Sequence, residues 1–178
     1  MYDLGPELDR ATLAAGSNLL VAGPPLSGKR RLAMSVLATG AHNGDGSIVV
    51  TTRDSSERVV SDFRRQLGSP QARDLGVVDC VSRQQGRPAS DSDRVKYASS
   101  PVDMTGIGML FSEFLQQFYA ERGLADNRVM VDSVSSLLVY ADLETVFRFL
   151  HAVTGRLEDA GALGVFVVES TAHDEEAL

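Results

Sequence analysis

The sequence is poor in cysteine, lysine and long apolar runs, and each shortage excludes a class of protein. Its single cysteine, Cys80, cannot form a disulfide within the chain, which fits a reducing compartment such as the cytoplasm. We interpret Cys80 as a small apolar residue at the end of a strand. The three histidines are scattered without the spacing of metal ligands, so we expect no structural metal.

Hydrophobic segments are short throughout the 178 residues. The longest resemble single strands, and none approaches the ~18 apolar residues that a membrane-spanning helix requires. The N-terminus lacks the basic patch followed by an apolar stretch that marks a signal peptide. We therefore expect a cytoplasmic protein without membrane contact.

Lysine is scarce within an acidic sequence. The formal net charge is −7, and Lys29 and Lys96 are the only lysines among 17 basic residues. An acidic, lysine-poor surface suits a salt-rich cytoplasm, because high net charge keeps proteins soluble there, and it favours a halophilic source. The same charge argues against nucleic acid as a partner, since that usually needs a clustered basic face.

Strand-like and helix-like segments alternate along a single domain, which we assign to residues 1–178. Apolar, β-branched runs predict strands, and apolar residues at helical spacing predict helices. The expected strands lie at residues 17–22, 46–52, 75–81, 128–133 and 163–170. The expected helices lie at residues 30–39, from Ser55 or Ser56 to Gly68, from a cap at Thr105 through Phe118, and from Asp142 through Leu157.

The expected strands are apolar without polar alternation, which is typical of a sheet buried on both faces. With helices between them, they predict an α/β fold with three αβα layers and a mostly parallel sheet of at least five strands. The polar segment 82–104 interrupts the alternation, and two interpretations stay open, a mobile insertion or a binding loop. Residues 171–178 are expected to form a polar tail.

The strongest functional signal is a glycine-rich loop between the first strand and the first helix. Its pattern Gly-x-x-x-x-Gly-Lys runs from Gly23 through Gly28 to Lys29. Backbone N–H groups of such a loop curl around phosphate at a helix N-terminus, and the lysine adds a positive charge. We therefore expect a nucleotide, ATP or ADP, to bind here. The candidate contact residues are Gly23, Pro24, Pro25, Leu26, Ser27, Gly28, Lys29, Arg30 and Arg31.

A second signal is an acidic residue where a later strand ends. Asp132 closes the apolar segment "RVMVDS", and in P-loop enzymes an aspartate in that place helps to hold Mg²⁺. Strands often end in aspartate for structural reasons, so this signal gains its weight from the glycine-rich loop. We take Asp132 as the candidate metal ligand.

Four segments together resemble the KaiC-like branch of the RecA superfamily of ATPases, and most of all its small archaeal, often haloarchaeal, members of signalling type. They are "LLVAGPPLSGK", "SIVVTTRDSSERV", "RVMVDSVSSLL" and "LGVFVVES", and the resemblance covers residues 17 to about 175. It implies a P-loop NTPase fold of the RecA type, with residues 23–29 as the Walker A loop and Asp132 as the Walker B acid. Glu169 would lie near the end of a strand beside the P-loop strand. RecA-like relatives form rings or filaments with nucleotide at subunit boundaries, so a homo-oligomer or a protein partner is also implied.

The sequence departs from that family at the residues that position metal and water. Relatives carry Ser or Thr, a magnesium ligand, where Arg30 stands, and arginine cannot ligate a cation. Two interpretations of Arg30 stay open: it contacts phosphate and partly replaces the metal, or it faces solvent. Relatives also end the second strand in paired glutamates that activate water, where this chain has Arg53 and Asp54. Asp54 can still orient water, and Asp54 and Glu169 are the candidate catalytic residues.

These features predict a nucleotide-binding regulatory protein with weak or absent ATP hydrolysis, acting through oligomer or partner contacts. Losing metal placement and a positioned water lowers rates by orders of magnitude, so enzymatic activity and Mg²⁺ stay open. One alternative is a pseudo-ATPase scaffold that binds no nucleotide, supported by Arg30 and Arg53. Another is a recombinase-like partner of DNA, which the net charge disfavours. Partner contacts are expected in segment 82–104 and in the tail near His173.

Overall fold

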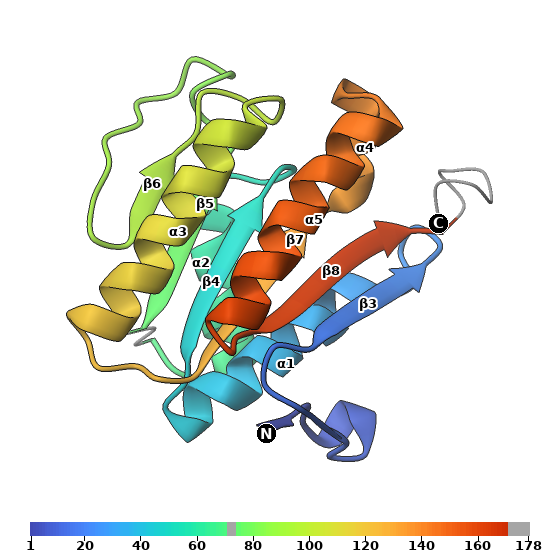
Figure 1. Ribbon diagram of the computed structural model, residues 1–178, viewed down its shortest axis with the longest axis vertical. Helices are drawn as coiled ribbons and strands as arrows, with labels where there is room; N and C mark the ends of the chain where they lie inside the picture. The colour runs from blue at the N-terminus through green and yellow to red at the C-terminus, as the bar shows by residue number, and fades with distance from the viewer. Residues whose placement is uncertain (71–73, 171–178) are drawn as a thin grey trace.

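Six parallel strands form the main sheet of this computed structural model, which describes residues 1–70 and 74–170 (Figure 1). Neighbouring strands follow the order β3-β8-β7-β4-β5-β6, and each neighbouring pair is parallel. The strands are β3 (Asn18–Gly23), β4 (Gly46–Thr51), β5 (Leu75–Asp79), β6 (Val95–Tyr97), β7 (Asn127–Asp132) and β8 (Leu163–Glu169). The prediction of a parallel sheet of at least five strands is confirmed.

Helices cover both faces of the sheet and complete three layers. On one face lie α1 (Lys29–Asn43) and α2 (Ser56–Leu67), and on the other lie α3 (Met104–Ala120), α4 (Val134–Tyr140) and α5 (Leu143–Asp159). Within residues 1–70 and 74–170, no helix is long and apolar enough to cross a membrane. The predicted αβα architecture is therefore confirmed.

Alternate residues of the strands enter two separate hydrophobic cores. On β4, Ile48 and Val50 pack with the layer of α3, α4 and α5, whereas Val49 between them packs with α1 and α2. Successive side chains of a strand point to opposite faces, so both sets must be apolar. This burial on both sides explains the uninterrupted apolar runs of the sequence.

A small antiparallel hairpin precedes the main sheet. It consists of β1 (Tyr2–Asp3) and β2 (Thr12–Leu13), with a 3-10 turn, η1 (Pro6–Leu8), between them. The guanidinium of Arg128 in β7 anchors the hairpin, because its Nη1 donates to the Asp3 carbonyl at 2.7 Å. Its Nε donates to Oδ2 of Asp45, between α1 and β4, at 2.8 Å. Arg128 is almost wholly buried, and its charge is paired with that of Asp45.

Three local predictions differ from the structure. The polar segment 82–104 contains β6, which extends the sheet beyond β5 through backbone pairing although its first two residues are only half-buried. Helix α3 begins at Met104 and not after Thr105, because Asp103 Oδ1 accepts a hydrogen bond from the Gly106 N–H at 2.9 Å. The sequence does not predict α4, since seven residues are too few to show helical periodicity. The predicted tail 171–178, with His173, lies outside the described residues.

Two other local predictions are confirmed. Asp142 caps α5, because its Oδ1 accepts a hydrogen bond from the Thr145 N–H at 2.8 Å. Cys80 directly follows β5 and is buried, and burial raises the pKa of its thiol above the ordinary value. Cys80 is therefore a neutral core residue, as its position in the sequence suggests.

Helix α2 begins against a carboxylate at the end of β5. Asp79 is fully buried, and its Oδ2 accepts hydrogen bonds at 2.7 Å from the Ser56 N–H and the Ser82 hydroxyl. Its Oδ1 accepts from the N–H groups of Val81 and Ser82 at 2.9 Å. Burial alone raises the pKa of Asp79, but these hydrogen bonds outweigh it and hold the pKa below its usual value. Asp79 therefore ties the start of α2 to the carboxyl edge of the sheet.

We expect Asp79→Ala to lower the free energy of unfolding by about 3 kcal/mol, because three buried N–H groups and a hydroxyl lose their acceptor. In the wild type, stabilisation by ionised Asp79 is complete above the ordinary carboxyl pKa of about 3.9 and is lost as the pH falls through the lower folded-state pKa. Urea unfolding at several pH values should therefore show a shallower acid loss for the variant. The exposed Asp159→Ala, with an effect below about 1 kcal/mol, is the control. Equal acid sensitivity of Asp79→Ala and wild type would contradict this role.

Candidate functional site

The glycine-rich loop joins β3 to α1 at the carboxyl edge of the sheet. Gly23 ends β3, and a Cβ there would lie 2.8 Å from the Ser27 hydroxyl oxygen. Gly28 immediately precedes α1 with a φ of 84°, a left-handed conformation that favours glycine. Gly28 therefore meets a conformational requirement of this loop, and Gly23 leaves room for the Ser27 hydroxyl.

The loop offers few N–H groups of its own. Pro24 and Pro25 have none, and the Ser27 N–H donates to the Pro24 carbonyl at 3.3 Å. The remaining donors are at Leu26, at Gly28 and in the first turn of α1, where N–H groups have no partner within the helix. Leu26 has a positive φ of 62°, and its side chain is fully exposed. A phosphate bound here would rely chiefly on the N-terminus of α1.

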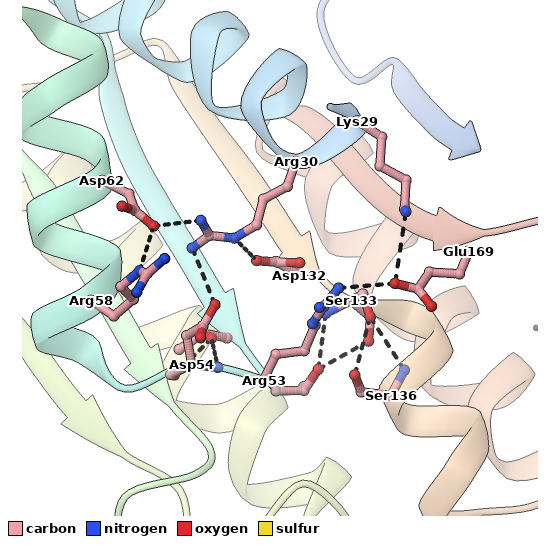
Figure 2. Close-up of polar contacts among 12 residues, drawn as sticks. Lys29, Arg30, Arg53, Asp54, Arg58, Asp62, Asp132, Ser133, Ser136 and Glu169 are labelled. Atoms are coloured by element: carbon pink, nitrogen blue, oxygen red, sulfur yellow. Dashed lines mark hydrogen bonds and ion pairs between the residues drawn. The ribbon is translucent and has the colours of Figure 1, made fainter. Parts of the chain in front are cut away.

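Lys29 opens α1, and its amine lies between the loop and the end of β8 (Figure 2). Its Nζ donates to the Pro24 carbonyl at 2.9 Å and is 3.7 Å from Glu169 Oε1. Glu169 ends β8, the neighbour of β3, which is the position that the family resemblance implies. The same Oε1 accepts a hydrogen bond from Arg53 Nη1 at 3.2 Å. Two cations therefore share this carboxylate.

Arg30 lies among three carboxylates from different elements (Figure 2). Its Nε is 2.5 Å from Asp132 Oδ2 at the end of β7. Its Nη1 is 2.6 Å from Asp62 Oδ2 on α2, and its Nη2 is 3.5 Å from Asp54 Oδ2 after β4. The side chain is only 23% exposed, so the interpretation that Arg30 faces solvent is wrong. Contact between Arg30 and phosphate stays a prediction.

Burial and pairing act in opposite directions on these charges. Burial raises the pKa of Asp132, which is fully enclosed, and the charge of Arg30 counteracts only part of this effect. Burial disfavours charged Arg30, but Asp132 and Asp62 outweigh it and raise the arginine pKa above its ordinary value. Burial also raises the pKa of Asp62, but the hydrogen bonds and charges of Arg30 and Arg58 together outweigh it and leave the pKa lowered. The surrounding acids therefore keep Arg30 charged.

Each candidate catalytic carboxylate faces an arginine. Asp54 is paired with Arg30, and Glu169 is paired with Arg53. Arg53 and Asp54 are adjacent in the chain, yet their side chains point to different partners (Figure 2). A general base must be free to take a proton from a molecule within hydrogen-bond reach. These ion pairs therefore weaken both residues for that role.

Asp62 is the site residue that the sequence does not reveal. Arg58 Nε is 3.2 Å from Asp62 Oδ2, and Arg65 Nη1 is 3.3 Å from Asp62 Oδ1. At separations of four and three residues, these contacts look like an ordinary ion-pair pattern on a helix surface. The contact with Arg30 joins residues 32 positions apart, and no sequence spacing signals it.

A cavity of about 550 Å³ adjoins the glycine-rich loop. Gly23, Gly28 and Lys29 line it together with Arg31 and Leu32 of α1. The candidate metal ligand and the candidate catalytic carboxylates are not among its lining residues. Arg31 therefore belongs to this cavity and not to the group of carboxylates around the preceding arginine.

Solved structures similar to this one include two proteins of the archaeon Pyrococcus horikoshii. A KaiC-like protein matches with a TM-score of 0.56 and 14% identity, covering 88% of this chain and 62% of its own. An uncharacterized protein in complex with an unknown peptide matches with a TM-score of 0.72 and 13% identity, covering 97% of this chain and 76% of its own. The chain therefore spans less than two thirds of the KaiC-like protein. At such low identity, the likeness shows the fold alone.

The strand order, the two helical layers and these similar structures define an α/β protein with the RecA/KaiC-like fold. The fold that the sequence resemblance implies is therefore confirmed. By sequence, the chain belongs to the family described as Family of unknown function (DUF7504), whose profile matches residues 16–178. A comparison with curated proteins finds no match.

We expect Arg30→Ala to lower the free energy of unfolding by about 3 kcal/mol, because it leaves the buried Asp132 without its cation. Asp132→Ala should lower it by about 2 kcal/mol, because Arg30 loses one acceptor but keeps Asp62 and Asp54. The double substitution should cost less than the sum of the two by about 2 kcal/mol or more, since neither charge is then left alone. Denaturant unfolding of the four proteins measures this coupling. Arg58→Ala, at a mostly exposed arginine, controls for loss of a cation, with an effect below about 1 kcal/mol. Additive single effects would show that the pair is not coupled.

Proposed function

We propose that this protein binds ATP or ADP through residues 23–29 and hydrolyses ATP weakly or not at all. The observation that carries the proposal is the strand–loop–helix unit, in which Gly28 adopts a conformation that favours glycine and Lys29 is held at the N-terminus of α1. A helix N-terminus and a lysine amine together favour a bound polyphosphate. In the regulatory role that we propose, the nucleotide biases contacts with other subunits or proteins.

Lys29 has contacts that a phosphate can replace. Its amine donates to a neutral acceptor, the Pro24 carbonyl, and its 3.7 Å separation from Glu169 is longer than a hydrogen bond. A phosphate oxygen is charged and forms a stronger, charge-assisted hydrogen bond with an ammonium group. Lys29 can therefore turn to a nucleotide without losing a stronger partner.

Weak hydrolysis follows from the pairing of the acids that the family resemblance assigns to chemistry. Asp132 accepts a hydrogen bond from Arg30, and Glu169 accepts one from Arg53. Asp54 is 3.5 Å from the Arg30 guanidinium. An arginine that contacts a carboxylate occupies a position from which that carboxylate would bind a metal or hydrogen-bond to water. Nucleotide can therefore stay bound for long periods without being consumed.

We expect calorimetric titration to detect ATP binding by the wild type, and Lys29→Ala to weaken it at least about tenfold through loss of the charge beside the phosphates. Lys96→Ala is the matched control, because Lys96 is the only other lysine, lies on β6 at the edge opposite β3, and pairs with Glu113. Phosphate release should stay below about 0.01 s⁻¹, roughly a hundredfold under the slow end of typical turnover. No heat at millimolar nucleotide would favour a pseudo-ATPase scaffold instead.

A second candidate function is an interaction scaffold that assembles through an exposed apolar surface. This surface lies where α4 meets α5 and consists of Val139, Tyr140, Leu143 and Phe147. Val139 and Tyr140 also line a cleft of about 310 Å³ together with Arg53, so the surface reaches the carboxyl edge of the sheet. Large apolar side chains gathered at a surface mark interaction sites. The peptide bound to one similar P. horikoshii protein supports partner binding on this fold.

We propose that a second copy of the chain covers this surface, as the resemblance to self-assembling RecA-like proteins implies. Phe147→Asp, at a side chain that is 66% exposed, should shift the protein toward monomers, because burying a charge in an apolar interface opposes association. Sedimentation velocity over a range of concentrations measures this shift. Tyr119→Asp on α3, at a side chain that is 70% exposed, is the matched control. A wild type that is monomeric throughout would rule out self-association and leave another protein as the partner.

A further inference from the structure

The KaiC-like resemblance implies Mg²⁺ beside the nucleotide, and the residues around Asp132 do not fit that ion. In P-loop NTPases, the hydroxyl after the lysine and an acid at a strand end hold the metal. Here Arg30 follows Lys29, and its Nε donates a hydrogen bond to Asp132 Oδ2 at 2.5 Å. A guanidinium has donors only, whereas Mg²⁺ needs oxygen ligands in a near-ideal octahedron. Arginine thus engages the acid that the metal would use.

Arg30 is held in this position from two sides. Its Nη1 is 2.6 Å from Asp62 on α2, and Asp62 is also contacted by Arg58 and Arg65. On the other side, Asp132 is fully buried at the end of β7. Moving Arg30 aside for a metal would separate it from two acids, one of which is enclosed. The guanidinium therefore opposes a divalent cation both by repulsion and by its own contacts.

The pairing also removes the need for a metal to screen the acids from a polyanion. Asp132 is paired with Arg30, and Asp62 is paired with Arg30, Arg58 and Arg65. Glu169 is paired with Arg53 and lies close to Lys29. Unpaired carboxylates would repel the phosphates of a nucleotide, and in a metal-dependent site the dication prevents this. Here arginines of the chain itself do so.

Arg30 retains a donor for a ligand. Within the described part of the chain, its buried Nη2 has no hydrogen-bond partner, since its ion pair with Asp54 spans 3.5 Å. A buried N–H without an acceptor destabilises the folded chain, and phosphate oxygens match a guanidinium in both charge and geometry. Arg30 belongs to the first turn of the helix that follows the glycine-rich loop. This spare donor therefore favours an anion beside Arg30, although Asp132 Oδ1, within the same group of side chains, is also buried without a donor among the described residues.

We propose that the site binds nucleoside di- or triphosphates free of divalent metal, with the Arg30 guanidinium in the place of Mg²⁺. The inference rests on the proposed nucleotide binding and adds the ionic form of the ligand. Arg30 shields the phosphates from Asp132 and turns its Nη2, which is buried in the structure, to a phosphate oxygen, while Lys29 and the N-terminus of α1 bind the other oxygens. A metal-bound nucleotide brings a dication that Arg30 repels. Mg²⁺ therefore competes with the protein for the nucleotide.

Calorimetric titration of the full chain with ATP, once in excess EDTA and once in excess Mg²⁺, tests the proposal. We expect the wild type to bind at least as tightly in EDTA as in Mg²⁺. Binding that is tighter in Mg²⁺ by about tenfold or more overturns metal-free binding and leaves the proposed function intact. No binding in either buffer overturns the proposed function itself.

Arg30→Thr restores the hydroxyl of KaiC-like relatives and should reverse the metal preference. We expect this variant to bind ATP at least about tenfold more tightly in Mg²⁺ than in EDTA, because Asp132 and the new hydroxyl are then free to hold the metal. Arg64→Thr, at an exposed position on α2, is the matched control and should behave as the wild type. Equal binding by Arg30→Thr in both buffers overturns the role of Arg30. Circular dichroism checks folding, and if the variant is unfolded, the two wild-type titrations decide.

Discussion

The contact between Arg30 and Asp132 joins the first turn of α1 to the end of β7, and the carboxyl edge of the sheet is arranged around it. Nε of Arg30 reaches a wholly buried acid, while Nη1 reaches α2 through Asp62. One guanidinium thereby holds three elements that are distant in the sequence. Because a buried carboxylate needs a cation beside it, Asp132 keeps Arg30 in place. The stability of this edge and, in our proposal, its choice of ligand thus depend on the same interaction.

In the function that we propose, this arrangement separates the binding of phosphate from its hydrolysis. Binding needs a helix N-terminus, a suitably shaped loop and Lys29, and the chain has all three. Hydrolysis also needs a positioned metal and a water-orienting acid, and arginines engage the residues that the family resemblance assigns to those roles. A RecA/KaiC-like fold is compatible with binding alone and with hydrolysis. The function is therefore inferred from the side chains at the strand ends and not from the fold.

The parts of the structure that the sequence predicts are those with local signals. The inner strands could be recognised because burial on both faces requires continuous apolar residues. The loop could be recognised because its glycines are close together in the chain. The partners of Arg30 could not be predicted, because its contacts with Asp62 and Asp132 join residues 32 and 102 positions apart. Strand β6 was also not predicted, because backbone pairing with β5 places it in the sheet without an apolar pattern of its own.

The adjacent prolines of the loop, Pro24 and Pro25, have an effect beyond the amides they remove. Each ring fixes φ at about −65°, so this stretch has little backbone entropy to lose in the proposed complex with an anion. Preorganisation of the loop thereby compensates for the hydrogen bonds that the two prolines cannot donate. In the complex that we propose, a loop with so little conformational freedom would favour anions that match its shape.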